Sequence, residues 1–180
     1  YWQHGAIKWT PIGNRFNTFQ GTFDGNGYAI IGLYINTTDM YQGLFGHLLS
    51  GTIKNLGIKD SYIKGGNYTG GIVGSVSSGK ITKCYNTGTV IGLTSPTGGI
   101  AGDISSNSQV SRCSNTGVVH GNRYNVGGIV GRVNNSTVTN CYNSGTIVGT
   151  GNCIGGVAGM TENGTVTMSY NTGCINGSVY

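Results

Sequence analysis

The chain has 180 residues, with 35 glycines, two prolines, 37% apolar residues and a formal net charge of +5. Its short apolar clusters exclude collagen, which needs glycine at every third place, and also exclude a flexible Gly-rich linker. Its ten Lys and Arg residues are scattered, so we expect no nucleic-acid partner, and no run approaches the roughly 20 apolar residues of a membrane span.

The N-terminal segment 1–42 is predicted to form a lead-in and a first coil, and residues 43–180 are predicted to form regular repeats. Together they make a single solenoid domain over residues 1–180, which we expect to be a piece of a longer protein. Within the lead-in, Asp24 in FDGNG has the spacing of one part of a calcium loop. The further acids that such a loop requires are missing, which favours an Asx-type turn.

The rest of the chain repeats one pattern at a nearly constant spacing. GLFG begins at Gly43, and related Gly-Gly copies begin, 28 or 29 residues apart, at Gly70, Gly98, Gly127 and Gly155. Each copy precedes a short alternating stretch and then a third apolar patch, so each repeat holds three β-prone runs. Three short strands bury an apolar face only when copies stack. The predicted fold is all-β: a right-handed parallel β-helix (β-solenoid) of about six coils of roughly 28 residues, with three short strands per coil.

Equivalent residues of neighbouring coils lie about 4.8 Å apart in such a solenoid, so they are expected to form internal columns. The first expected column is Leu44, Ile72, Ile100, Ile129 and Val157. The second is Ile30, Ile53, Ile81, Val110, Val138 and Val166. The third is Leu33, Leu56, Cys84, Cys113, Cys141 and Ser169.

The structural core ladder Leu56, Cys84, Cys113 and Cys141 places cysteine where an earlier coil has leucine, so these thiols are interpreted as small buried hydrophobes. In-register Cβ atoms about 4.8 Å apart exceed the usual separation in a disulfide. We therefore expect these three cysteines to be buried and reduced. Cys153 and Cys174 lie outside the column, and their pairing stays open.

A column of asparagines, each two residues before a glycine, is expected at a turn; it contains Asn86, Asn115, Asn143 and Asn171. Asparagine tolerates left-handed backbone, and its amide can bond to copies above and below. The paired glycines are likewise interpreted as tight corners, since a phosphate loop needs a following helix.

The polar residues offer no recognisable catalytic or metal site. The five acids are spread one or none per coil, whereas the paired carboxylates of glycosidases must lie roughly 5–10 Å apart. The three histidines are isolated, the sequence His-Glu-x-x-His is absent, and the cysteines lack the short-range pairs typical of zinc sites. We therefore expect a non-enzyme with no catalytic residues, no metal and no cofactor.

Two surface patterns are candidate binding sites. Tyr85, Tyr142 and Tyr170 occupy equivalent positions, interrupted by Ser114, and suit contact with sugar rings as well as simple packing along a turn. The second pattern resembles the water-ordering faces of ice-binding proteins, with Thr-x-Thr repeated at Thr137, Thr139, Thr165 and Thr167. Ordinary cross-strand threonine pairing also explains it, because the columns are broken by Lys54, Lys80 and Gln109.

The segment FQGTFDGNGYAIIGLYINTTDMYQGLFGHLLSGTIKNLGI, residues 19–58, followed by GGIVG coils, resembles bacterial surface proteins that carry the GLUG motif. The Gly-Leu-any-Gly core lies at residues 43–46, and later copies replace Leu by Ile or Val and add a preceding Gly. WTPIGNRF, from Trp9, is similar to the lead-in of such arrays. The resemblance implies an extracellular location, attached to the cell surface or secreted, as in adhesin-like proteins and the repeat regions of immunoglobulin-A-cleaving metallopeptidases.

The expected function is a non-catalytic structural and adhesive module of a bacterial surface protein, with host glycans or proteins as partners. The alternative is an accessory or substrate-positioning domain of a secreted peptidase, or a glycan-binding or ice-binding face. An uncapped coil also favours end-to-end self-association.

Overall fold

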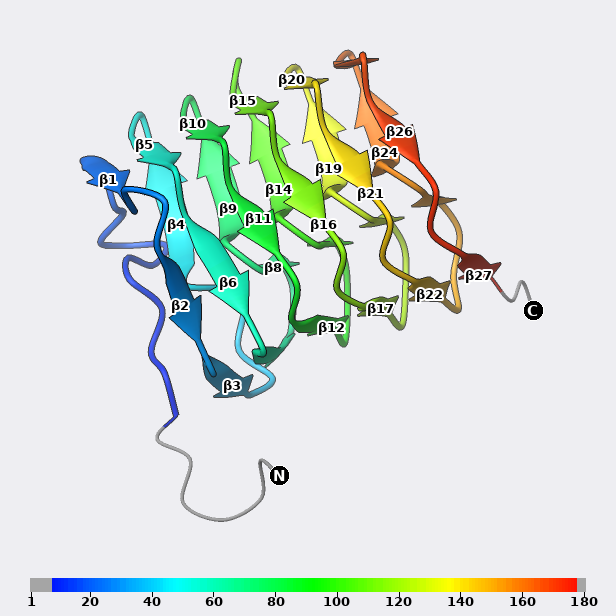
Figure 1. The fold of residues 1–180 in the computed structure, drawn as a ribbon, viewed down its shortest axis with the longest axis horizontal. Coiled ribbons are helices and arrows are strands. Elements are labelled where there is room, and N and C mark those ends of the chain that lie inside the picture. Colours follow the sequence, from blue (N-terminus) through cyan, green and yellow to red (C-terminus); the bar gives the residue numbers. More distant parts are fainter. Residues whose placement is uncertain (1–7, 178–180) are drawn as a thin grey trace.

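The structure, a computed structural model, describes residues 8–177. Within that range the chain forms 27 short strands and no helix, and the strands pair in parallel into five sheets. Figure 1 shows the coils advancing from β1, in blue, to β27, in red, along one axis. The chain descends through the nearer strands and ascends through the fainter ones as it advances, so the solenoid is right-handed. The predicted parallel β-solenoid of about six turns is confirmed. No described segment is a helix with the length and hydropathy needed to cross a membrane.

Each complete coil passes through the five sheets in the order A, B, C, D and E. Sheet A contains β4 (Phe45–Leu49), β9 (Val73–Ser77), β14 (Ala101–Ser105), β19 (Val130–Asn134) and β24 (Ala158–Glu162). Sheet B contains β1 (Thr22–Asp24), β5 (Thr52–Lys54), β10 (Lys80–Thr82), β15 (Gln109–Ser111), β20 (Thr137–Thr139) and β25 (Thr165–Thr167). Sheet C contains β2 (Ala29–Ile31), β6 (Gly57–Lys59), β11 (Tyr85–Asn86), β16 (Ser114–Asn115), β21 (Tyr142–Asn143) and β26 (Tyr170–Asn171).

Sheet D contains β3 (Tyr34–Asn36), β7 (Tyr62–Gly65), β12 (Thr89–Gly92), β17 (Val119–Gly121), β22 (Ile147–Gly149) and β27 (Ile175–Gly177). Sheet E contains β8 (Thr69–Gly70), β13 (Thr97–Gly98), β18 (Val126–Gly127) and β23 (Ile154–Gly155). In Figure 1 the strands of sheet C lie in front and those of sheet A lie behind them.

A complete coil therefore has five strands, and the expected number of three was wrong. The three expected runs are the strands of sheets A, B and D. The two additional strands are short pieces, such as β8 and β11, each two residues long. Their residues, Thr-Gly and Tyr-Asn, were interpreted as turns because two residues are too few to show an alternating pattern.

The core is built from the expected columns, with one correction in the first coil. Leu44, Ile72, Ile100 and Ile129 are each no more than 1% exposed. The inner column of sheet B begins with Phe23 and not with Ile30, because Phe23 pairs with Ile53. Ile30 instead pairs with Ile58 in sheet C, and the residue after Leu33 pairs with Tyr62 in sheet D.

The cause of this shift is the length of one turn. Four residues separate β1 from β2, whereas two residues separate β5 from β6. The two extra residues move every later position of the first coil by two places. Ile30 and Leu33 therefore lie one sheet further along than a fixed period predicts.

The asparagine column forms a buried hydrogen-bond ladder. Asn86, Asn115 and Asn143 are fully buried. Asn86 Nδ2 donates to Asn115 Oδ1 at 2.8 Å, Asn115 Nδ2 donates to Asn143 Oδ1 at 2.8 Å, and Asn143 Nδ2 donates to Asn171 Oδ1 at 2.7 Å. Each amide also donates to the carbonyl of the glycine two residues later, as Asn115 does to Gly117 at 2.9 Å. The expected bonding between copies is confirmed.

The expected left-handed backbone lies elsewhere. The ladder asparagines are the second residues of two-residue strands in sheet C. The corner before the cysteine column is left-handed, at Asn55, Lys83, Arg112, Asn140 and Met168. A second left-handed corner, between sheets A and B, contains Ser50, Ser78, Asn107, Asn135 and Asn163. Asparagine is frequent at both because its short polar side chain tolerates this conformation.

The two ends of the solenoid differ. At the N-terminal end the lead-in covers the core: Ile12 forms a parallel bridge with Phe45, and the Phe19 ring lies 5.0 Å from the Phe45 ring. At the other end the last coil leaves inner positions open, with Val166 36% exposed and Ile175 45% exposed. The apolar stack is therefore covered on one side only within the described residues.

Candidate functional site

The tyrosine row on the outer face of sheet C is the first candidate. Tyr85, Ser114, Tyr142 and Tyr170 occupy one column. The rings of Tyr142 and Tyr170 are stacked, with centroids 5.6 Å apart and planes 12° from parallel. They are 38% and 58% exposed, so they form a flat aromatic surface one rung high.

Tyr85 is separate from that pair. Two rungs, or roughly 10 Å, separate it from Tyr142, with Ser114 between them. The Tyr85 ring lies over Gly57, where an added Cβ would overlap it, and Lys59 Nζ lies 5.8 Å from its centroid. Of the three tyrosines, the structure brings only Tyr142 and Tyr170 together as an open surface.

The threonine columns lie on the outer face of sheet B. Thr137 pairs with Thr165, and Thr139 pairs with Thr167, whose Oγ1 donates to Thr139 Oγ1 at 3.3 Å. Lys80 occupies the position next to Thr52, and Lys54 occupies the position next to Thr82. The regular array is therefore confined to the last two coils, and its hydroxyls bond to one another.

The cysteine column is buried, and its thiols also form hydrogen bonds. Cys84, Cys113 and Cys141 are each 1% exposed and unbonded to one another. Cys113 Sγ donates to Ser111 O at 3.2 Å, and Cys141 Sγ accepts from Cys113 N at 3.4 Å. Ser169 Oγ makes the equivalent pair of bonds, accepting from Cys141 N at 3.1 Å and donating to Thr167 O at 2.8 Å.

This geometry explains why serine replaces cysteine in the last coil. The position needs a small side chain that both donates to its own strand and accepts from the preceding coil, and a thiol and a hydroxyl both do so. Burial raises the pKa of the Cys113 thiol well above its ordinary value, which keeps it protonated. Cys153 and Cys174 are exposed and free.

The acids do not converge. Asp24 Oδ1 accepts from Asn26 N and from Asn55 Nδ2, both at 2.9 Å, and Lys54 Nζ lies 3.2 Å from Asp24 Oδ2. The hydrogen bond from Asn55 is the main cause that lowers the Asp24 pKa. These contacts occupy the carboxylate as an Asx turn does, which is the expected interpretation. Across residues 8–177, no three His, Cys, Asp or Glu side chains are arranged to hold a metal ion.

Sequence reasoning missed a polar and aromatic group on the outer face of sheet A. Asp103 is 3% exposed and accepts a 2.6 Å hydrogen bond from Arg132 Nε on the next coil. That hydrogen bond raises the Arg132 pKa. The Tyr41 ring stacks between those of Tyr68 and His47, with centroid distances of 4.8 and 5.6 Å. A signal existed, because Tyr41 and Tyr68 each stand two residues before the first glycine of a repeat.

Burial determines the protonation of this group. It lowers the pKa of His47, with partial compensation from Asp103, and it is the main cause that raises the pKa of Tyr41. His47 Nε2 lies 3.4 Å from Ser77 Oγ, whereas His47 Nδ1 is buried without a hydrogen-bond partner among the described residues. One Ser75 rung separates His47 from Asp103, so the two side chains do not form a catalytic pair.

Comparison with known proteins identifies the repeat. The GLUG motif matches at residues 65–91 and 122–148, each of which spans one coil. A protein of Evansella cellulosilytica, provisionally named a Gly-rich membrane protein, is 45% identical over 65 residues, which cover 35% of this chain and 8% of that protein. Halomucin of Haloquadratum walsbyi is 36% identical over 107 residues, which cover 58% of this chain and 1% of that protein. The chain thus spans less than a tenth of the length of either relative.

A solved structure has the same fold. It is a crystal structure from Bacteroides ovatus, provisionally titled an immunoglobulin A1 protease. Its TM-score is 0.71 at 22% identity, over 98% of this chain and 63% of that one. At this identity the likeness concerns the fold alone. The chain carries GLUG repeats, and each repeat is one coil of a right-handed parallel β-solenoid.

Proposed function

We propose that this chain is a non-catalytic structural and adhesive module of an extracellular surface protein. The observation that carries the proposal is the in-register stacking of five or six coils in every sheet but one, which makes a stiff body with uniform walls. Backbone hydrogen bonds between coils and the buried asparagine ladder resist bending. Such a body holds neighbouring domains apart and presents long rows of identical side chains to a partner.

The adhesive part of the proposal rests on Tyr142 and Tyr170. Stacked, exposed tyrosines present an apolar face with polar rims, which suits the ring of a sugar or an exposed peptide. The test is a glycan and extracellular-protein array with the wild-type chain and the double variant Tyr142→Ala/Tyr170→Ala. Tyr85→Ala is the matched control, because that ring lies apart over Gly57. Equal binding by the double variant would exclude the pair as the contact surface.

The second candidate function is an accessory or substrate-positioning domain of a secreted peptidase. It is favoured by the fold shared with the Bacteroides ovatus structure. The chain alone is expected to leave immunoglobulin A1 uncut during prolonged incubation. Cleavage that disappears with the protein would contradict the non-catalytic proposal. Binding to immunoglobulin A1 without cleavage would favour the accessory role over the adhesive one.

The extracellular location is proposed from the names of the two relatives, a membrane protein and a mucin-like name, halomucin. Brief proteolysis of intact producing cells should release peptides of this chain if it is outside. Recovery of the chain only after lysis would contradict the location.

End-to-end self-association is proposed through the C-terminal coil, because Val166 and Ile175 are exposed there while Phe19 and Ile12 cover the other end. Sedimentation velocity should then show a concentration-dependent dimer. Val166→Lys should abolish it, and a dimer that persists in this variant would exclude that end as the interface.

A further inference from the structure

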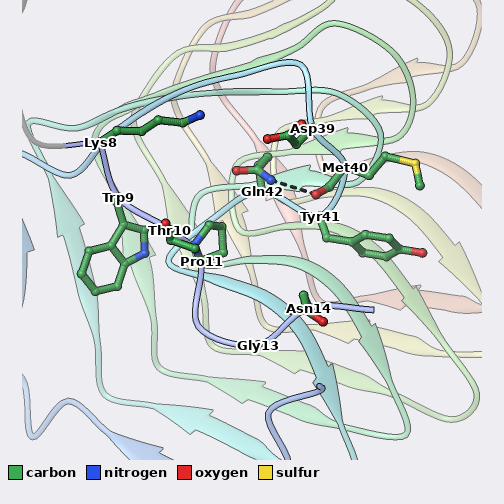
Figure 2. Close-up of a pocket in the computed structure, with 10 residues that line it drawn as sticks. All are labelled: Lys8, Trp9, Thr10, Pro11, Gly13, Asn14, Asp39, Met40, Tyr41 and Gln42. Carbon is green, nitrogen blue, oxygen red and sulfur yellow. Dashed lines mark hydrogen bonds between the residues drawn. The ribbon is translucent and has the colours of Figure 1, made fainter. Parts of the chain in front are cut away.

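A small open cavity lies at the N-terminal rim, where the lead-in crosses the turn between sheets D and A. Its volume is about 180 Å³, and Lys8, Asp39 and Gln42 contribute its polar side chains. Figure 2 shows these three side chains directed toward a common space, while the side chains of Met40 and Tyr41 point away from it. The cavity is on a different face from the tyrosine pair and does not depend on it.

The floor of the cavity is a buried amide with one unused acceptor. Gln42 is only 5% exposed, and its Nε2 donates to Met40 O at 2.8 Å. Its stem packs against Gly65, where an added Cβ would overlap it, so the side chain has little freedom. Among residues 8–177 no group donates to Gln42 Oε1, which Figure 2 shows turned away from Met40 toward Lys8 and Asp39. A buried amide oxygen is unfavourable without a donor, so a ligand hydroxyl or amine is favoured there.

The rim supplies a second acceptor and a donor. Thr37 Oγ1 donates to Asp39 Oδ2 at 2.7 Å and accepts from Asp39 N at 3.2 Å, which fixes the carboxylate and leaves Oδ1 available. Lys8 reaches across the opening toward Asp39, but the described side chains form no ion pair there. The cavity therefore offers two acceptors facing one donor, with no net charge.

We propose that this cavity binds one sugar ring through a pair of adjacent hydroxyl groups. A hydroxyl both donates and accepts, so a vicinal diol can donate to Gln42 Oε1 and Asp39 while accepting from the Lys8 ammonium. The volume corresponds to about six waters at roughly 30 Å³ each, which fits a single ring and is below the roughly 300 Å³ of sites for larger ligands.

An amino-acid zwitterion is the competing ligand, since it also presents a positive and a negative end. In an open cavity its two ion pairs are exposed to water and contribute little. The buried oxygen of Gln42 favours instead a neutral ligand whose hydroxyl replaces the missing donor. Because no aromatic ring faces the cavity, binding is expected to be weak, of millimolar order.

The test is a titration of the isotope-labelled full chain, observed by amide chemical shifts, with methyl mannoside as the vicinal-diol probe. Shifts are expected at Gly13 and Met40, which line the cavity. Asp39→Asn should weaken binding about tenfold, because a neutral amide replaces the charged acceptor. This variant changes an exposed side chain and should fold, which keeps the test decisive if Gln42→Leu does not. Asn122→Ala, on the opposite end of sheet D, is the control that should bind as the wild type does.

Two results would overturn the proposal. One is preferential binding of glycine over the mannoside, which would assign the cavity to a zwitterion. The other is the absence of shifts at the cavity up to tens of millimolar mannoside. The double variant Tyr142→Ala/Tyr170→Ala should retain these shifts. Its failure on the glycan array, with the cavity intact, would therefore separate the two binding surfaces.

Discussion

Arg132 Nε donates to Asp103 Oδ1 at 2.6 Å across two neighbouring coils, and Asp103 is 3% exposed. The two residues are 29 positions apart in the sequence and share one column of sheet A with Ser75 and Met160. A buried carboxylate is tolerated on this face because the guanidinium neutralises it.

Removing only the arginine should therefore destabilise the fold. Arg132→Met, which copies the next residue of the column, is expected to lower the free energy of unfolding by about 3 kcal/mol, because Asp103 stays buried and unpaired. The double variant Asp103→Ser/Arg132→Met should recover most of the loss. Urea titration measures both, and Lys54→Met is the control, since Lys54 and Asp24 form an exposed pair. A double variant as unstable as the single one would show that the pair itself supplies net stability.

Ile129→Asp should unfold the array. Ile129 is fully buried in the column between Ile100 and Val157, so the substitution places an unpaired charge inside the core. We expect a loss on the order of 4 kcal/mol, measured by thermal and urea unfolding. Ile31→Asp makes the same chemical change at a residue that is 68% exposed and should have little effect. An unchanged melting temperature for Ile129→Asp would place that residue outside the core.

Asn115→Ala should break the asparagine ladder at its centre. The change leaves the Asn86 amide, the Gly117 carbonyl and the Asn143 oxygen without a partner in a fully buried place. The expected loss is on the order of 3 kcal/mol in the free energy of unfolding. The exposed Asn122, changed to alanine, is the reference. Equal stability of the two variants would mean that water or a backbone shift replaces the ladder bonds.

The five cysteines should separate into two classes by reactivity. Cys153 and Cys174 are exposed and should be alkylated at once in the native protein, whereas Cys84, Cys113 and Cys141 should react only after denaturation. Mass mapping of peptides before and after unfolding measures this and contains its own positive control. A disulfide-linked peptide pair from any two of the column cysteines would disprove the prediction.

His47 should make the fold less stable in acid. Burial lowers the pKa of His47 in the folded state below its ordinary value of 6.5, so the unfolded chain binds the proton more readily. Stability should thus fall as the pH falls through the ordinary value of 6.5, until the folded-state pKa is passed. The neighbouring charge of Asp103 opposes this effect, and the rings of Tyr41 and the hydroxyl of Ser77 face His47.

His47→Gln should reduce the acid sensitivity of the melting temperature, measured between pH 5 and pH 8. His120→Gln, on sheet D, gives the reference for removing one histidine. If both variants retain the full acid sensitivity of the wild type, the carboxylates and not His47 cause it.

The sequence by itself determined the period, the parallel stacking and the content of the inner columns of the regular coils. This follows from the geometry of a solenoid, because a fixed spacing along the chain becomes a fixed position on the coil. Ile100 and Ile129 are neighbours in space for that reason alone, and so are Tyr142 and Tyr170. The stacked, open pair among the three candidate tyrosines could therefore be anticipated in register, although not in exposure.

Only the tertiary structure decided the features that do not repeat. Two-residue strands such as β8 and β11 have no alternation to read, and the longer turn after β1 moved Ile30 and Leu33 to other sheets. The cavity of Lys8, Asp39 and Gln42 exists because the lead-in crosses a turn of a later segment. That path is held by single contacts, including the 3.2 Å bond from Trp9 Nε1 to Leu44 O, which no period encodes.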